Sequence, residues 1–224
     1  MSDPRGDRWG TGRPSYYQDP QIAASYGRRW ERGFARWKHE RKLGILARWL
    51  APARSVLEVA CGPGRFPSAV AGRFAVALDL SAAMLREYRL RGAGVHLVRA
   101  DASRLPFADG SFETVTCIRY LSHLRGEFRA TVLAELVRVT SNEVIIDGRH
   151  RYNLRFISRW IRRRLRLAHA DKLRHTFGEF HRELQAAGLE IVATRSIAWG
   201  LSARFLVRAR KLQPRAAAPL PKPR

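Results

Sequence analysis

The stretch from Ser55 to Phe66, S-V-L-E-V-A-C-G-P-G-R-F, constrains the fold of this chain more than any other. Its first half is typical of a short buried strand, and its second half contains a Gly-Pro-Gly turn. Gly62 and Gly64 carry no Cβ and adopt positive φ readily, so a ligand can lie directly against their backbone. A strand that ends in a glycine-rich turn is typical of nucleotide-binding α/β folds. The spacing fits neither the phosphate-binding G-x-G-x-x-G pattern nor a P-loop, so the nature of the ligand depends on the residues that follow.

Strands and helices alternate along the chain after this turn. We expect five strands at 55–60, 74–80, 95–100, 112–118 and 143–147, with helices at 66–72, 81–91 and 127–139. A helix at 175–187 then precedes two strands, at 189–195 and 204–210, that we expect to pair antiparallel. The predicted fold class is α/β: a Rossmann-like, doubly wound, mostly parallel seven-stranded sheet with an antiparallel last strand and an N-terminal helical cap.

The other segments complete the expected domain organisation. Residues 1–20 lack periodicity and are predicted to form a flexible arm. A single domain is expected over 21–211, with a helical cap at 21–50, a ligand-binding core at 51–150 and a basic helical insertion at 151–175. Gly33 and Gly44 weaken the helical pattern of the cap, so one helix or two with a joint are both open. Residues 212–224 are predicted to be a disordered tail.

The composition limits the class of protein. A formal net charge of +23 in 224 residues predicts attraction to polyanions, although arginine-rich coding bias gives the same composition. No apolar run is long enough to cross a membrane, and no signal peptide is expected. Cys61 and Cys117 are expected to be free thiols in a reducing compartment, and the seven histidines lack the spacing of a metal site. These features predict a cytoplasmic protein, with peripheral membrane attachment as an open alternative.

Polar side chains follow the expected strands. Asp79 ends the second strand, Asp101 follows the third and Arg119 follows the fourth. Because the carboxyl ends of parallel strands meet at one edge of a sheet, these side chains should share a crevice with the glycine turn. Glu58 lies inside the first strand, where a buried acid is costly unless it has a partner or a function.

Three motifs in this order resemble the class I S-adenosylmethionine-dependent methyltransferases. They are E-V-A-C-G-P-G-R-F, the strand that ends in Asp79, and R-A-D-A-S-R-L-P-F-A-D-G-S-F-E. The small-molecule group, similar to the ubiquinone/menaquinone biosynthesis methyltransferases, is the nearest in pattern. The resemblance covers residues 50–150 well and extends loosely to about 210. It implies in-line methyl transfer from S-adenosylmethionine to a small-molecule or lipid-like acceptor, a reaction that depends mainly on alignment of the acceptor.

The resemblance also implies roles for individual residues. Glu58 would organise the methionine end of the cofactor, Asp79 would accept hydrogen bonds from both ribose hydroxyls, and Asp101 would read the adenine. Ala60 departs from the family pattern, in which this loop position is a glycine. The whole implied cofactor set is Glu58, Ala60, Cys61, Gly62, Gly64, Asp79, Leu80, Asp101, Ala102 and Arg119.

Two histidines, His123 and His150, are the candidate catalytic residues, because a base assists when the acceptor is a hydroxyl or an acidic carbon. Each could instead position the substrate or cap a helix. Tyr16, Tyr17 and Tyr26 are candidates to line a lid formed by the N-terminal arm.

Several alternatives stay open. The basic segment Arg149–Arg166 fits a solvated helix face, a lid that docks on an anionic membrane, or an RNA-binding patch. Two alternatives to a small-molecule methyltransferase also stay open: the chain could methylate a nucleic acid, or it could be a non-catalytic relative that binds the cofactor. The charge favours the first, but Cys-Ile-Arg-Tyr stands where a signature for amino-group methylation would follow the fourth strand. No obligate protein partner is predicted.

Overall fold

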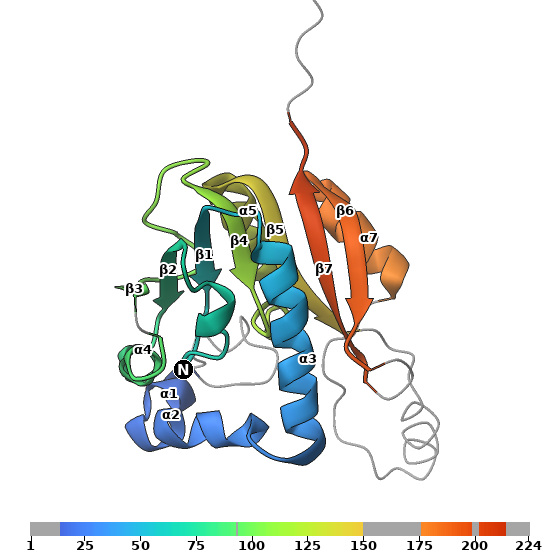
Figure 1. The fold of residues 1–224 in the computed structure, drawn as a ribbon. Coiled ribbons are helices and arrows are strands. Elements are labelled where there is room, and N and C mark those ends of the chain that lie inside the picture. Colours follow the sequence, from blue (N-terminus) through green and yellow to red (C-terminus); the bar gives the residue numbers. More distant parts are fainter. Residues whose placement is uncertain (1–13, 93, 150–175, 199–201, 214–224) are drawn as a thin grey trace, which may run out of the picture.

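A computed structural model describes residues 14–92, 94–149, 176–198 and 202–213, and these residues form one seven-stranded sheet (Figure 1). The strand order is β3-β2-β1-β4-β5-β7-β6. The strands are β1 (Ser55–Val59), β2 (Phe74–Asp79), β3 (His96–Arg99), β4 (Phe112–Cys117), β5 (Thr140–Arg149), β6 (Leu189–Ser196) and β7 (Arg204–Lys211). Every pair from β3 to β5 is parallel, and β7 is antiparallel to both β5 and β6. The predicted fold class is confirmed.

Helices cover both faces of the sheet. On one face lie α3 (Gly33–Leu50) and α4 (Ala82–Arg89), and on the other lie α5 (Gly126–Val139) and α7 (Phe177–Ala186). Residues of β1 alternate between the two layers: Val56 packs with Leu46 of α3, whereas Leu57 belongs to the cluster that contains α5 and α7. A strand buried on both sides favours apolar residues, which explains Val56, Leu57 and Val59 of β1, and Glu58 is the buried exception.

The N-terminal cap lies across the carboxyl ends of the parallel strands. Figure 1 shows α1 (Pro14–Gln18) and α2 (Pro20–Tyr26) beside α4, at the end of the sheet toward which β1, β2 and β4 point. A 3-10 turn at Gly27–Trp30 leads from α2 toward α3. The Ser81 hydroxyl donates a hydrogen bond to the Tyr17 carbonyl over 2.5 Å and thereby fastens α1 to the start of α4.

Within the arm predicted over 1–20, residues 14–20 contain α1 and the start of α2. Asp19 caps α2 by accepting a hydrogen bond from the Gln21 N–H over 2.8 Å, and Pro20 occupies the first helical turn. Tyr17 packs against a small cluster that includes Ala23 and Met84. These tertiary contacts order a helix of five residues that would be unstable alone.

Other boundaries also differ from the predictions. The expected helix at 66–72 is only a 3-10 turn at Pro67–Ala69, because Gly72 follows at φ 76° and takes the chain directly into β2. The helical cap is divided before Gly33, whereas Gly44 lies within α3. β5 extends to Arg149 because it pairs along its whole second half with β7. The helices expected at 81–91, 127–139 and 175–187 are confirmed as α4, α5 and α7.

Parts of the predicted organisation lie outside the described residues: the arm at 1–13, the basic insertion at 151–175 and the tail from 214 onward. Across the described ranges, no helix combines the length and the apolar character needed to cross a bilayer. Cys61 and Cys117 are both free and buried, as predicted.

Candidate functional site

A cavity, called here the central cavity, opens where β1, β2 and β4 end. Its lining includes Gly62 from the turn after β1, Asp79 at the end of β2 and Arg119 after β4. The N-terminal cap contributes Tyr17 from α1 and Tyr26 from α2. The ends of β2 and β4 and the glycine turn after β1 therefore meet in one crevice.

The glycine turn presents bare backbone to this cavity. The Gly62 N–H donates a hydrogen bond to Asp79 Oδ2 over 2.9 Å, and the Ser81 N–H donates to Asp79 Oδ1 over the same distance. Gly62 has φ 60°, and a Cβ at this position would meet no atom within 4 Å. Gly64 differs, because its Cβ would lie 3.2 Å from Tyr88 Cα. Gly62 therefore faces open space, whereas Gly64 allows the turn to pack against α4.

Two residues that border the cavity have unusual backbone conformations. Ala60 has φ 54° and Arg119 has φ 71°, and they are the non-glycine residues with positive φ in the described part of the chain. This conformation costs about 1–2 kcal/mol for a residue with a Cβ. Strain of this kind is concentrated at functional sites, where the surrounding structure compensates for it. Ala60 thus keeps the backbone that a glycine would adopt at this position.

Two buried acids lie beneath the turn. Glu58 is 6% exposed and accepts a hydrogen bond from the Tyr88 hydroxyl over 3.0 Å. Burial raises the pKa of Glu58 to about 7, the Tyr88 hydrogen bond opposes this rise, and the charge of Asp79 adds to it. Burial also raises the pKa of Asp79 from its ordinary value, against the effect of the three backbone N–H groups of Ser81, Gly62 and Leu80.

The structure brings most of the predicted cofactor set to the central cavity, but not all of it. The lining residues from this set are Glu58, Ala60, Cys61, Gly62, Asp79, Leu80, Ala102 and Arg119. Gly64 and Asp101 are not among them. Asp101 Oδ1 accepts hydrogen bonds from the N–H and the hydroxyl of Ser103, both over 2.9 Å. Its neighbours Ala100 and Ala102 line the cavity instead. The role of Asp101 toward an adenine stays a prediction.

Of the two candidate bases, His123 lines the central cavity and His150 lies outside the described residues. Burial, followed by the positive charges of Arg119, Arg149 and Arg204, lowers the pKa of His123 to about 4, against the opposing charge of Asp147. The imidazole is therefore neutral at physiological pH, but it is a weak base in this environment.

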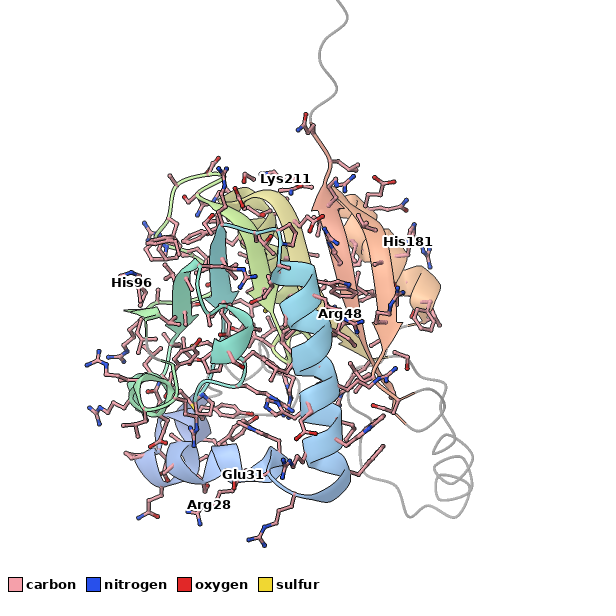
Figure 2. The ribbon with its side chains drawn as sticks, in the orientation of Figure 1. Arg28, Glu31, Arg48, His96, His181 and Lys211 are labelled. Carbon is pink, nitrogen blue, oxygen red and sulfur yellow. The ribbon has the colours of Figure 1, made fainter. Side chains whose placement is uncertain are left out.

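Other histidines are dispersed over the molecule. Figure 2 shows His96 and His181 at opposite edges of the sheet, and both are exposed. His39 is partly buried, and its Nδ1 accepts a hydrogen bond from Arg65 Nε over 3.4 Å. In the residues that the structure describes, no three metal-binding side chains come together.

A second group of charged residues was missed by the sequence analysis. Lys42 of α3 is only 3% exposed and lies near Asp147, which ends the apolar run of β5. Asp147 Oδ2 pairs with Arg204 Nη1 over 2.9 Å, and Asp147 Oδ1 accepts a hydrogen bond from the Arg119 N–H over 2.5 Å. The available signal was the position of Lys42, which precedes Ile45 and Leu46 by three and four residues and so lies on the apolar stripe of its helix.

Comparisons with known proteins agree with this geometry. Residues 56–143 match the family described as "Methyltransferase domain". The demethylmenaquinone methyltransferase of Renibacterium salmoninarum is 40% identical over 107 residues, which cover 47% of this chain and 43% of that protein. The enzyme of the same name from Corynebacterium urealyticum is 42% identical over 93 residues, or 41% and 39% of the two chains. The matches span less than half the length of these curated relatives.

Solved structures extend the likeness beyond the matched segment. The magnesium protoporphyrin IX methyltransferase of Synechocystis PCC 6803, solved with bound SAH, has a TM-score of 0.72 at 18% identity. The alignment covers 88% of this chain and 97% of that one. At this identity the likeness establishes a shared fold.

Proposed function

We propose that this chain, which belongs through residues 56–143 to the class I S-adenosylmethionine-dependent methyltransferase family, transfers a methyl group from S-adenosylmethionine to a small-molecule acceptor. The observation that carries the proposal is the hydrogen bond between the Gly62 N–H and Asp79 Oδ2. It holds a carboxylate beside bare backbone, inside a cavity at the carboxyl ends of parallel strands. Ligands of open α/β sheets bind at this edge.

The residues of the central cavity fit the cofactor. Asp79 Oδ2 accepts from the Gly62 N–H and Asp79 Oδ1 from the Ser81 N–H, and a carboxylate has about four lone-pair sites, so acceptor capacity remains for a further donor. The two neighbouring hydroxyls of a ribose are a matching pair of donors. The open space in front of Gly62 admits a ligand against the backbone. Ala100 and Ala102 offer a small apolar surface on which an adenine ring can pack.

S-adenosylmethionine, when bound, supplies an electrophilic methyl group on a sulfonium. The chain itself has to bind it, orient the acceptor and exclude water. Tyr17, Tyr26 and Trp30 cover the cavity with aromatic surface and limit the access of water. His123 lies on the β4 side of the cavity, where it can accept a hydrogen bond from an acceptor group.

The names of the relatives support a proposal for the acceptor class. Those with the highest similarity reported above are named demethylmenaquinone methyltransferases, and we propose a small-molecule or lipid-like acceptor for this chain as well. Labelled-methyl incubation with a fractionated cell extract tests this class. Label in the RNA fraction would support a nucleic-acid methyltransferase instead, and cofactor binding without any labelled product would support a non-catalytic relative.

Calorimetric titration with S-adenosylhomocysteine tests the cofactor site. We expect saturable binding, and we expect Asp79→Asn to weaken it about tenfold or more, because an amide cannot accept from both ribose hydroxyls and both backbone N–H groups. Asp109→Asn is the matched control, since Asp109 is an exposed acid paired with Arg138 away from the cavity. Equal binding by both variants, or no binding by the folded wild-type chain, would refute the proposed site.

A further inference from the structure

A second cavity, called here the basic cavity, adjoins the central cavity and shares Trp30, Arg65 and Arg119 with it. Its lining contains six basic side chains and, among the described residues, no acidic one. The basic residues are Lys38, Lys42, Arg65, Arg119, Arg149 and Arg204. They come from α3, the glycine turn, the segment after β4, and the ends of β5 and β7, so the fold gathers them from distant parts of the sequence.

The nearby acid does not balance this charge. Asp147 is 1% exposed in its side chain and already pairs with Arg204 and with the Arg119 N–H. Although burial alone would raise it, the pKa of Asp147 lies below its ordinary value because Arg204 and Lys42 stabilise the carboxylate. One carboxylate among so many cations leaves the cavity strongly positive.

Burial and mutual repulsion lower the pKa values of basic side chains in this cavity. Burial lowers the pKa of Lys42 well below its ordinary value, and the charges of Arg65, Arg204 and Arg119 lower it further against the attraction of Asp147. Burial, followed by the charges of Arg119 and Arg204, lowers the pKa of Arg65 to about 9. Clustered buried cations destabilise a fold unless an anion accompanies them.

Two guanidinium nitrogens in this region have no partner among the described residues. Arg65 Nη1 and Arg119 Nε are buried, and neither donates a hydrogen bond to an acceptor among the described residues. A guanidinium presents its N–H groups in a planar fork that matches the oxygens of a carboxylate or a phosphate. Arg65 is also held in position, because its guanidinium stacks on Trp30 at 4.7 Å and its Nε donates to His39.

We propose that the methyl acceptor carries an oxyanion group, a phosphate or a carboxylate, which binds in the basic cavity between Lys42, Arg65, Arg119 and Arg204. This inference rests on the proposed function and specifies its substrate class. Arg119 and Arg65 border both cavities, so an acceptor anchored by its anion would extend from the basic cavity toward the methyl donor. The anion would supply the missing acceptors for the two orphaned guanidinium nitrogens.

The methyl donor has a carboxylate of its own, which could also reach Arg65. A single carboxylate at Arg65 would not account for Lys42 and Arg204, because these two residues line the basic cavity and not the central cavity, and share the buried Asp147 carboxylate as their nearby counter-charge. The test is therefore made on the full chain saturated with S-adenosylhomocysteine. Inorganic phosphate, pyrophosphate and malonate are titrated in turn at constant ionic strength, so that general screening stays fixed.

Lys42→Met is the diagnostic variant and Arg48→Met is its matched control. Both remove one positive charge from α3, but Arg48 is exposed on the outer side of the helix (Figure 2). We expect saturable binding of at least one anion, weakened about ten- to a hundredfold by Lys42→Met and unchanged by Arg48→Met, since a charge-assisted hydrogen bond is lost only in the first. The preferred anion identifies the group as phosphate or carboxylate. Lys42→Met should fold normally, because Asp147 keeps Arg204 as its partner.

Three results would overturn the inference. One is equal weakening by both variants, which would indicate non-specific attraction to a basic protein. Another is the absence of saturable anion binding, and the third is anion binding that disappears when S-adenosylhomocysteine is present, which would assign the basic cavity to the donor. Failure of the proposed function has a different signature: the chain would bind the anion through Lys42 but would not bind S-adenosylhomocysteine.

Discussion

Gly62 provides the sharpest test of where the ligand lies. A methyl group at this position would project into the central cavity without touching any protein atom within 4 Å. The Gly62→Ala variant should therefore lose stability only through its backbone, since φ 60° costs an alanine about 1–2 kcal/mol. The affinity for a ligand should fall independently of this loss of stability, because the methyl group occupies space that a ligand against the backbone would fill.

Gly72 offers a matched control for this substitution. It has φ 76°, it is exposed, and a Cβ there also meets no atom within 4 Å, but it lies before β2 and does not line the cavity. Gly62→Ala and Gly72→Ala should thus lose a similar free energy of unfolding, about 1–2 kcal/mol each in equilibrium urea denaturation. Only Gly62→Ala should weaken S-adenosylhomocysteine, by about five- to a hundredfold, if overpacking the contact costs about 1–3 kcal/mol.

Calorimetry and urea denaturation of the two variants separate these effects. Equal affinity of Gly62→Ala and Gly72→Ala for S-adenosylhomocysteine would refute the idea that the ligand lies against the Gly62 backbone. A much larger stability loss for Gly62→Ala would instead mean that the turn itself cannot hold an alanine, and the binding data could then be interpreted only at temperatures where the variant is folded.

Two further predictions concern the same turn and the acid beneath it. Ala60→Gly should raise the free energy of unfolding by about 1 kcal/mol in urea denaturation, because φ 54° is strained for alanine and not for glycine; an unchanged or lower stability would contradict the strain. The pKa of Glu58 is raised to about 7 in the folded chain, so the folded state binds more protons than the unfolded state between about pH 4.5 and 7, and stability should fall as the pH rises through this window, by up to about 3 kcal/mol. Glu58→Gln should lack this contribution, so equal slopes of stability against pH for both proteins would rule it out.

The sheet and the central cavity could be predicted because their signals are local. Each strand of the parallel sheet is a short apolar run, and Asp79 and the glycine turn follow such runs directly in the sequence. The common edge then follows from the rule that parallel strands end on the same side. The resemblance to class I methyltransferases drew on the same residues and is supported by the family match at 56–143.

The basic cavity could not be predicted in this way, because it depends on how distant elements pack. Lys42, Arg65 and Arg204 are separated by more than twenty residues from one another, and only the crossing of α3 over the sheet brings them together. Charged residues are common in this arginine-rich chain, so the buried ones do not stand out by type. α1 escaped prediction for a related reason, since its order comes from the contacts of Tyr17 with α4 and not from its own five residues.

The predicted partners beyond the acceptor stay predictions. Apart from Arg149, the segment Arg149–Arg166 lies outside the described residues, so docking on an anionic membrane or on RNA has no structural support here. His150 also lies outside the described residues, so its role as a catalytic base stays a prediction.

The bond between Ser81 and Tyr17 has a kinetic consequence. Ser81 begins α4 beside Asp79, and the Tyr17 carbonyl that it contacts belongs to the cap over the central cavity. Cap residues line one part of this cavity, so the residence time of a ligand bound there would depend in part on local opening of residues 14–30. Turnover would then be governed by release of the spent cofactor, and the rate of cap opening would set an upper limit to the catalytic rate.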